Sequence, residues 1–178
     1  MCHTPPRVRL ALLVLLPCIL AGEAAAAGPP ICPPGGTDRA AVVCELNAAR
    51  AEAGREPVRA RPSLERAATA HAADMVERRY FAHDSPGGSS AADRARRAGY
   101  MRGAERWRIG EILIWTRGTP LTAKAAVDAW LASPSHRRIL LSRPYDDVGV
   151  GIVPGAPSGD PEAQPATTIA VSFGRRSG

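Results

Sequence analysis

The sequence predicts a layered α+β domain in which helices pack against a small, mostly antiparallel sheet. In the first half of the 178-residue chain, apolar residues recur at the three- and four-residue spacing of amphipathic helices. From Trp107 onward the spacing changes to two, as expected of strands that bury one face. Helical segments reappear between the later strands, and no internal repeat is present, which favours a single domain.

Three helices are expected before residue 100, each bounded by residues that commonly cap helix ends. Their expected ranges are 38–54, 63–79 and 90–99. Asp38 is the N-cap of the first helix, and Ser90 forms a capping box with Asp93 at the start of the third. The segment 80–88, rich in turn-forming residues, is expected to be a loop.

The second half is expected to contain three strands and two further helices. The strands are expected at 107–115, 148–152 and 169–173. Thr119-Pro120 and Ser133-Pro134 each place a proline at the first position of a helix, where its missing N–H is not needed. The segment 154–165 is expected to be a flexible connector.

Residues 1–27 are expected to be an export signal that is cleaved before Gly28. Two arginines precede an uncharged apolar run, and small residues follow it at the cleavage position. The run is too short, and too interrupted by Pro17, to form a stable transmembrane anchor. The rest of the chain divides into a Pro/Gly-rich arm, 28–37, and the folded domain, 38–178.

The cysteines point to an oxidising compartment. Cys2 and Cys18 belong to the expected signal, where acylation of Cys18 would be the alternative, lipoprotein route. Cys32 and Cys44 remain, and an even pair in an exported protein predicts a disulfide, with two reduced thiols as the alternative. We therefore expect a secreted protein, extracellular or periplasmic.

The charge distribution indicates the kind of partner. The chain has a formal net charge of +6 and a pI near 9.8, almost all of it from arginine. Such a charge attracts anionic envelope polymers or lipid head groups. The basic residues are scattered and aromatic residues make up only 4% of the chain, so a nucleic-acid partner is not expected.

Glu111 is the most unusual residue of the predicted strand 107–115. The other side chains on its face of the strand are apolar, and a buried carboxylate costs several kcal/mol unless it is paired. Glu111 is therefore either buried with polar partners or turned to solvent by a bulge at Gly110.

Three histidines remain outside the expected signal. His71 lies on the core-facing side of its helix and is expected to be a hydrogen-bonded packing residue. His83 and His136 fall in a loop and at a helix start, where binding sites are often built. With Glu111 they would suffice for a catalytic-type Zn²⁺ site, or a site for another divalent cation, with an open fourth position. The sequence contains no phosphate-binding glycine loop and no nucleophile elbow.

Short motifs along the chain form an ordered set. They are Leu46–Arg50, Ala68–Met75, Phe81–Pro86, Arg94–Tyr100, Gly110-Glu111, Trp130–Leu140, Val148–Gly151 and Ser172–Gly174. In this order they resemble the SCP domain of bacterial members of the CAP family, which comprises cysteine-rich secretory, antigen 5 and pathogenesis-related 1 proteins. The resemblance covers roughly residues 40–174.

The resemblance implies a three-layer α-β-α sandwich with a cleft, in which two histidines and two acidic residues can hold a divalent metal. By position, His83, Glu111 and His136 are three of these four residues. The fourth, acidic position is Ser133 here, and Asp128 on the same helix is the candidate substitute. The family's usual Asn after the glutamate is replaced by isoleucine.

Three classes of function remain open. The resemblance implies a binding module whose cleft takes a lipid, an envelope component or a protein partner. A hydrolase dependent on a divalent metal would use Glu111, with Asp128 or Ser85 assisting. A non-catalytic interaction protein would need the polar cluster only for stability. We favour the binding module, because a Glu111 used as a metal ligand leaves no clear general base.

Overall fold

The structure is a computed structural model that describes Met1, residues 28–118 and residues 121–178. The remainder of the expected export signal and the Thr119-Pro120 pair lie outside the described residues. Within the described part of the chain, no helix is long and apolar enough to cross a membrane.

A four-stranded sheet with strand order β1-β3-β4-β2 forms the middle layer of the domain. The strands are β1 (Arg59–Ala60), β2 (Arg106–Arg117), β3 (Asp147–Pro154) and β4 (Ala166–Ser177). The short β1 pairs parallel with β3, whereas β3 and β2 both pair antiparallel with β4. Strand β2 therefore forms one edge of the sheet, along which the candidate site is built.

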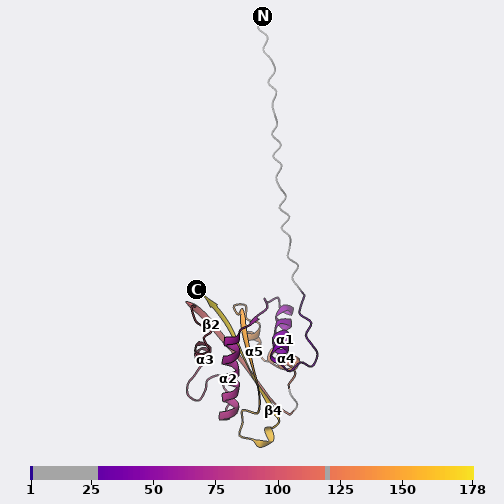
Figure 1. Cartoon of the computed structure of the whole chain (residues 1–178). Helices are drawn as coiled ribbons and strands as arrows, with labels where there is room; N and C mark the ends of the chain where they lie inside the picture. Colours follow the sequence, from indigo (N-terminus) through magenta and orange to yellow (C-terminus); the bar gives the residue numbers. More distant parts are fainter. Residues whose placement is uncertain (2–27, 119–120) are drawn as a thin grey trace.

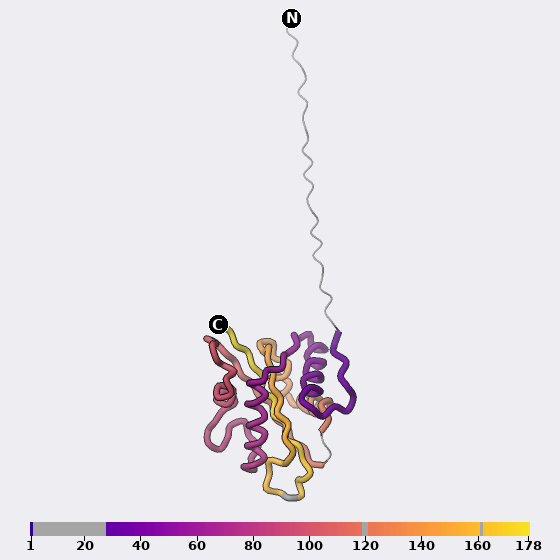
Figure 2. The backbone as a smooth tube through the Cα atoms, in the orientation of Figure 1, coloured from indigo at the N-terminus to yellow at the C-terminus, as the bar shows by residue number. Residues whose placement is uncertain are grey.

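Helices cover both faces of this sheet (Figures 1 and 2). They are α1 (Arg39–Glu52), α2 (Pro62–Arg78), α3 (Ala91–Arg97), α4 (Ala123–Ala132), α5 (Pro134–Leu140) and the 3-10 helix η1 (Pro161–Ala163). Helices α2 and α3 lie on one face, and α1, α4 and α5 lie on the other. The predicted α+β class and its three-layer α-β-α arrangement are confirmed.

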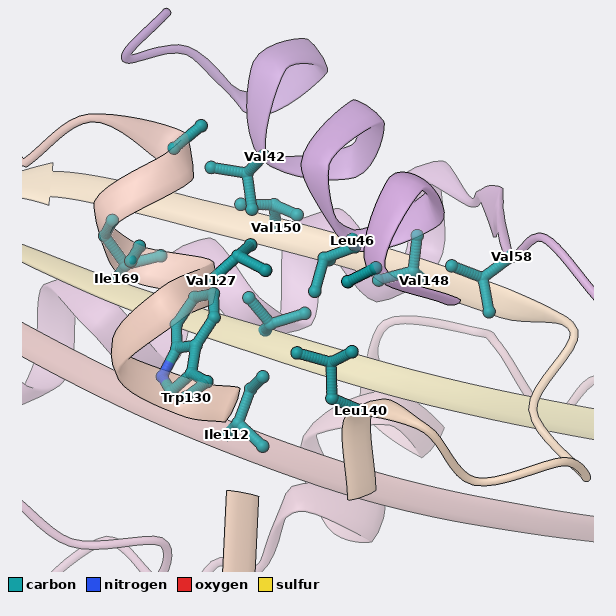
Figure 3. Packing of buried hydrophobic residues seen from close by; sticks show 14 of the residues in the cluster. Val42, Leu46, Val58, Ile112, Val127, Trp130, Leu140, Val148, Val150 and Ile169 are labelled. Carbon is teal, nitrogen blue, oxygen red and sulfur yellow. The ribbon is translucent and has the colours of Figure 1, made fainter. Parts of the chain in front are cut away.

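The largest apolar cluster fills the space between the sheet and helices α1, α4 and α5 (Figure 3). Trp130 is its largest side chain, and the indole N–H donates to the carbonyl of Leu113 at 3.1 Å. Because successive strand residues point to opposite faces, Ile112 joins this cluster while Leu113 packs beneath α2 in a smaller one. Strand β2 thus contributes to the core on both sides.

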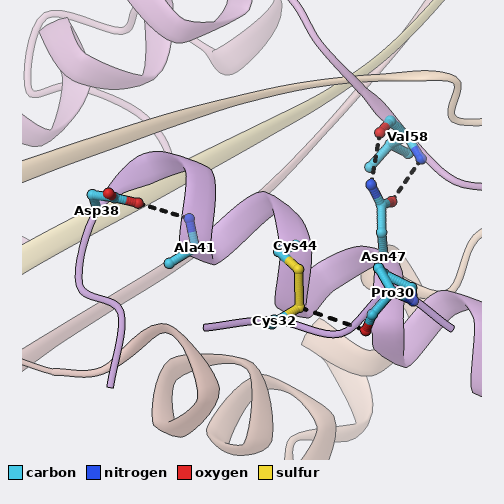
Figure 4. The surroundings of a disulfide bond; sticks show 7 residues. All are labelled: Pro30, Cys32, Asp38, Ala41, Cys44, Asn47 and Val58. Carbon is cyan, nitrogen blue, oxygen red and sulfur yellow. Dashed lines mark hydrogen bonds between the residues drawn. A yellow bond between two sulfur atoms is a disulfide. The ribbon is translucent and has the colours of Figure 1, made fainter. Parts of the chain in front are cut away.

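The N-terminal arm is fastened to α1. The predicted disulfide between Cys32 and Cys44 is present, with the two Cα atoms 5.7 Å apart (Figure 4). Asp38 is the N-cap of α1, as predicted, and accepts a hydrogen bond from the backbone N–H of Ala41 at 2.7 Å. This side-chain acceptor satisfies one of the N–H groups left free at a helix start.

Three expectations about secondary structure were wrong or incomplete. Strand β1 was not predicted, because two residues with exposed side chains carry no alternation to detect. Helix α4 begins at Ala123 rather than at Pro120, since the side chain of Thr122 caps it by accepting from Ala125 N–H. The segment expected to be a flexible connector contains η1 and buries Ala156 and Ala163 against neighbouring residues.

Helix α2 lies directly on strand β3 because two glycines of the strand have no side chain. A Cβ atom on Gly149 would lie 2.1 Å from the carbonyl carbon of Leu64, and one on Gly151 would lie 2.4 Å from that of Ala68. Both distances are far below van der Waals contact with helix backbone, which cannot yield as a flexible side chain would.

We predict that Gly149→Ala lowers the free energy of unfolding by about 3 kcal/mol, because the added methyl group must push α2 away from the sheet. Gly87→Ala is the matched control, since a Cβ there meets nothing within 4 Å; its effect should stay within about 0.5 kcal/mol. Urea denaturation followed by circular dichroism measures both. Equal midpoints for the two variants would contradict this account of the packing.

Candidate functional site

Glu111 lies near the middle of β2 on the face covered by α2 and α3, and it is only 5% exposed. The pairing of β2 with β4 runs without interruption from Arg106 opposite Ser177 to Arg117 opposite Ala166. The alternative of a bulge that turns Glu111 to solvent is therefore wrong. A buried carboxylate at this position requires polar partners.

Two side chains bind Glu111 directly. Arg94 donates from Nη2 to Oε2 at 2.8 Å, and this guanidinium is itself only 6% exposed. His83 Nδ1 lies 3.0 Å from Oε1. Hydrogen bonds between ionised groups are among the stronger ones in proteins, and here the arginine and the carboxylate are both shielded from water.

Arg94 also fixes the loop that carries His83. Its guanidinium donates to the backbone carbonyls of Ser89 at 2.7 Å and His83 at 2.8 Å. The predicted capping box of Ser90 and Asp93 is present at the start of α3, so Arg94 sits in the first helical turn. One buried side chain therefore joins the loop, α3 and the edge strand.

His71 is buried and hydrogen-bonded, as predicted, but it also borders the site. Its Nε2 lies 3.0 Å from the carbonyl oxygen of Ala82, which requires a proton on that nitrogen, and 3.6 Å from Oε1 of Glu111. Burial lowers the pKa of His71 below its ordinary value, although the nearby Glu111 acts in the opposite direction. His71 is thus a neutral donor that holds the His83 loop through the carbonyl of Ala82.

His83 and His136 differ in their electrostatic surroundings. The side chain of His83 is 56% exposed, and its hydrogen bond with Glu111 raises its pKa. Burial, and then the neighbouring charge of His83, lower the pKa of the partly buried His136. On acidification His83 therefore becomes an imidazolium before His136 does.

Across residues 28–118 and 121–178, no group of three or more His, Cys, Asp or Glu side chains is arranged to hold a metal ion. Both oxygens of Glu111 are already hydrogen-bonded, and no hydrogen bond or ion pair within these residues joins Glu111 to His136. Zinc binding by His83, Glu111 and His136 therefore stays a prediction.

The other two catalytic candidates have partners of their own. The Oγ of Ser85 lies 3.1 Å from the hydroxyl of Tyr80, which in turn donates to Asp74. Asp128 is exposed on α4, across the sheet from α2, and pairs with Lys124 at 2.5 Å. Among the hydrogen bonds of the described residues, none joins Ser85 or Asp128 to a histidine or to Glu111.

Comparisons with known proteins identify the family. A model of the cysteine-rich secretory protein family, CAP, matches residues 43–171. The chain belongs to this family. It is also similar to the protein YkwD of Bacillus subtilis (strain 168), with 32% identity over 112 residues. That match covers 62% of this CAP chain and 41% of YkwD, so the chain spans about two fifths of its relative.

Solved structures show the same fold. An outer surface protein from Borrelia burgdorferi has a TM-score of 0.61 and 23% identity, covering 76% of this CAP chain and 90% of its own. An extracellular protein containing an SCP domain from Bacillus anthracis has a TM-score of 0.58 and 24% identity. The match covers 74% of this CAP chain and 38% of the Bacillus anthracis chain. Both likenesses support the α-β-α arrangement.

Sequence reasoning missed Arg94 and the closeness of His71 to Glu111. Arg94 opens the motif Arg94–Tyr100, which resembles a CAP helix, but the resemblance gives this arginine no role at the site. The signal that could have identified it was the place of Glu111 on an apolar strand face, because a carboxylate buried there needs a cation and Arg94 follows the His83 loop closely.

We predict that Glu111→Gln lowers the pKa of His83, because an amide still accepts a hydrogen bond but carries no charge. In the wild type this pKa is raised above the unfolded value of about 6.5. The contact therefore stabilises the fold fully below the unfolded pKa and loses its effect as the pH rises through the folded pKa. Titration of the histidine ring resonances by NMR measures the shift; an unchanged His83 titration would contradict it.

We predict that Arg94→Met destabilises the protein by about 3–5 kcal/mol, because it leaves Glu111 buried without its cation. Arg96→Met on the same helix is the control, since its ion pair with Asp93 is exposed; it should cost about 1 kcal/mol or less. The double variant Arg94→Met/Glu111→Gln should recover part of the loss. Denaturant unfolding measures the free energy of unfolding of all three variants. If the effects of Arg94→Met and Glu111→Gln were strictly additive in the double variant, the result would argue against a stabilising ion pair between Arg94 and Glu111.

Proposed function

We propose that this CAP protein is an exported binding module that holds a component of the cell envelope at the surface formed by His83 and His136. One observation carries the proposal: both oxygens of Glu111 are bound, by Arg94 and by His83. Glu111 in this arrangement orients a half-exposed imidazole. The groups left to meet a ligand are the rings of His83 and His136.

Export and an envelope ligand are supported by independent features. The disulfide between Cys32 and Cys44 suits an oxidising compartment. The two structural neighbours are named as an outer surface protein and an extracellular protein. The net charge of +6 favours association with the anionic polymers and lipids of an envelope.

The metal-dependent hydrolase is the less favoured alternative. A general base needs a lone pair within reach of the proton that it removes. Glu111 has both oxygens in hydrogen bonds, and Ser85 and Asp128 are bonded to other groups. Hydrolysis by Glu111 would therefore need a substrate or water molecule to reach a buried carboxylate past Arg94 and His83, whereas binding uses the exposed ring of His83 as it stands.

We expect the purified protein to bind soluble cell-wall fragments or phosphatidylglycerol vesicles, with affinity reduced about tenfold in His83→Ala, because a donor to an anionic ligand is lost. Thr37→Ala, on the exposed part of the arm, is the control and should bind like the wild type. Calorimetry for the fragments and sedimentation for the vesicles provide the measurements. Equal binding by the two variants would contradict a role for His83.

Zinc binding and turnover separate the alternatives. Tight one-to-one binding of Zn²⁺, lost in His83→Ala, Glu111→Gln and His136→Ala, together with turnover of an envelope polymer, would support the hydrolase instead. A folded wild type that binds neither probe and no Zn²⁺ would leave the non-catalytic interaction protein.

A further inference from the structure

A separate cavity of about 600 Å³ opens between α2, α3 and the loop at 85–89. This volume lies within the range of small-molecule binding sites, about 300–1,000 Å³. The charged groups on its wall are four arginines and one acid: Arg66, Arg78, Arg94, Arg97 and Asp74. Neither His83 nor His136 lines it.

Two of these four arginines are matched by carboxylates. Arg94 pairs with Glu111 at 2.8 Å, and Arg78 pairs with Asp74 at 3.4 Å. Neither Arg66 nor Arg97 has a carboxylate within 4 Å among the described residues. The wall of the cavity therefore carries two uncompensated positive charges.

Arg66 and Arg97 approach the cavity from different helices and hold only neutral acceptors. Arg66 donates to the carbonyl of Ala98 at 2.9 Å, which ties α2 to the end of α3. Arg97 donates to the hydroxyl of Ser89 at 2.5 Å. A guanidinium has five N–H donors, and each of these contacts uses one Nη2 group, so further donors remain for a ligand.

The rest of the wall limits the ligand's chemistry. Ala67, Ala70 and Ala98 provide apolar surface beside the two arginines. A phosphate monoester carries close to two negative charges and three terminal oxygens, which match two forked guanidinium groups from two helices. Its organic substituent would lie on the alanine surface.

We propose that the α2/α3 cavity binds a phosphate monoester, with Arg66 and Arg97 as its charged donors. This is a second site beyond the proposed function, because it uses side chains that do not take part in the His83–His136 surface. The shared ligand chemistry is the phosphate monoester group, carried either by a small soluble molecule or by a lipid such as phosphatidate.

The test measures binding of phenyl phosphate by calorimetry at low salt, beside inorganic phosphate. Phenyl phosphate should bind more tightly than inorganic phosphate, because the ring covers the alanine surface. Arg66→Gln/Arg97→Gln should weaken it at least about tenfold. Arg143→Gln/Arg175→Gln, which removes the same charge from exposed positions outside the cavity wall, should leave the affinity within about twofold.

Vesicles of phosphatidylcholine with and without phosphatidate distinguish the ligand's source. Phosphatidate-dependent binding that is lost in Arg66→Gln/Arg97→Gln assigns the site to a lipid, whereas binding of phenyl phosphate alone assigns it to a soluble monoester. Equal losses in the two double variants, or no binding of either probe by the wild type, would overturn the proposal.

A second measurement does not depend on the folding of any variant. In the wild type, phenyl phosphate should shift the side-chain N–H resonances of Arg66 and Arg97 in ¹H–¹⁵N NMR spectra. Shifts confined to other arginines would overturn the assignment. Because His83→Ala should keep this site, loss of envelope binding in His83→Ala and loss of phosphate binding here are separate results.

Discussion

The buried contact between Arg94 and Glu111 holds the candidate site together. It joins α3 to an edge strand, and the same guanidinium fixes two carbonyls of the His83 loop. Neither charge could stay in this low-dielectric position without the other, since an unpaired buried ion costs several kcal/mol. The hydrogen bonds from Arg94 therefore set the conformation of the His83 loop, and they hold the exposed ring of His83 in one position.

Strand β2 supplies both the site and the core, because its side chains alternate between faces. Glu111 faces α2 and α3, while its neighbour Ile112 packs into the cluster beneath α1 and α4. On the opposite face of the sheet, the fully buried Arg50 of α1 likewise binds backbone carbonyls. It donates to the carbonyl of Leu140 at 2.6 Å and to that of Ser142 at 3.1 Å, which fixes the end of α5, the helix that carries His136.

Arg94 contributes to two places on the molecule. Through Glu111 it orients His83, and it also forms part of the wall of the α2/α3 cavity. Its own charge is matched within the protein, so the attraction that the cavity exerts on an anion depends on Arg66 and Arg97. The buried charge of Arg94 thus stabilises the fold, whereas the exposed charges of Arg66 and Arg97 remain available for a ligand.

The sequence by itself determined the helices and the longer strands, the Cys32–Cys44 disulfide and the conflict posed by Glu111 on an apolar face. The helices, the strands and the conflict at Glu111 follow from capping residues, periodicity and desolvation, which act over a few residues. The disulfide follows from the pair of cysteines that remains outside the expected signal. Only the tertiary structure decided that Arg94 and His71 surround Glu111 and that β1 joins the sheet. Such contacts depend on how distant segments pack: Arg94 and Glu111 are 17 residues apart and Arg50 and Leu140 are 90, too far for any local pattern to encode.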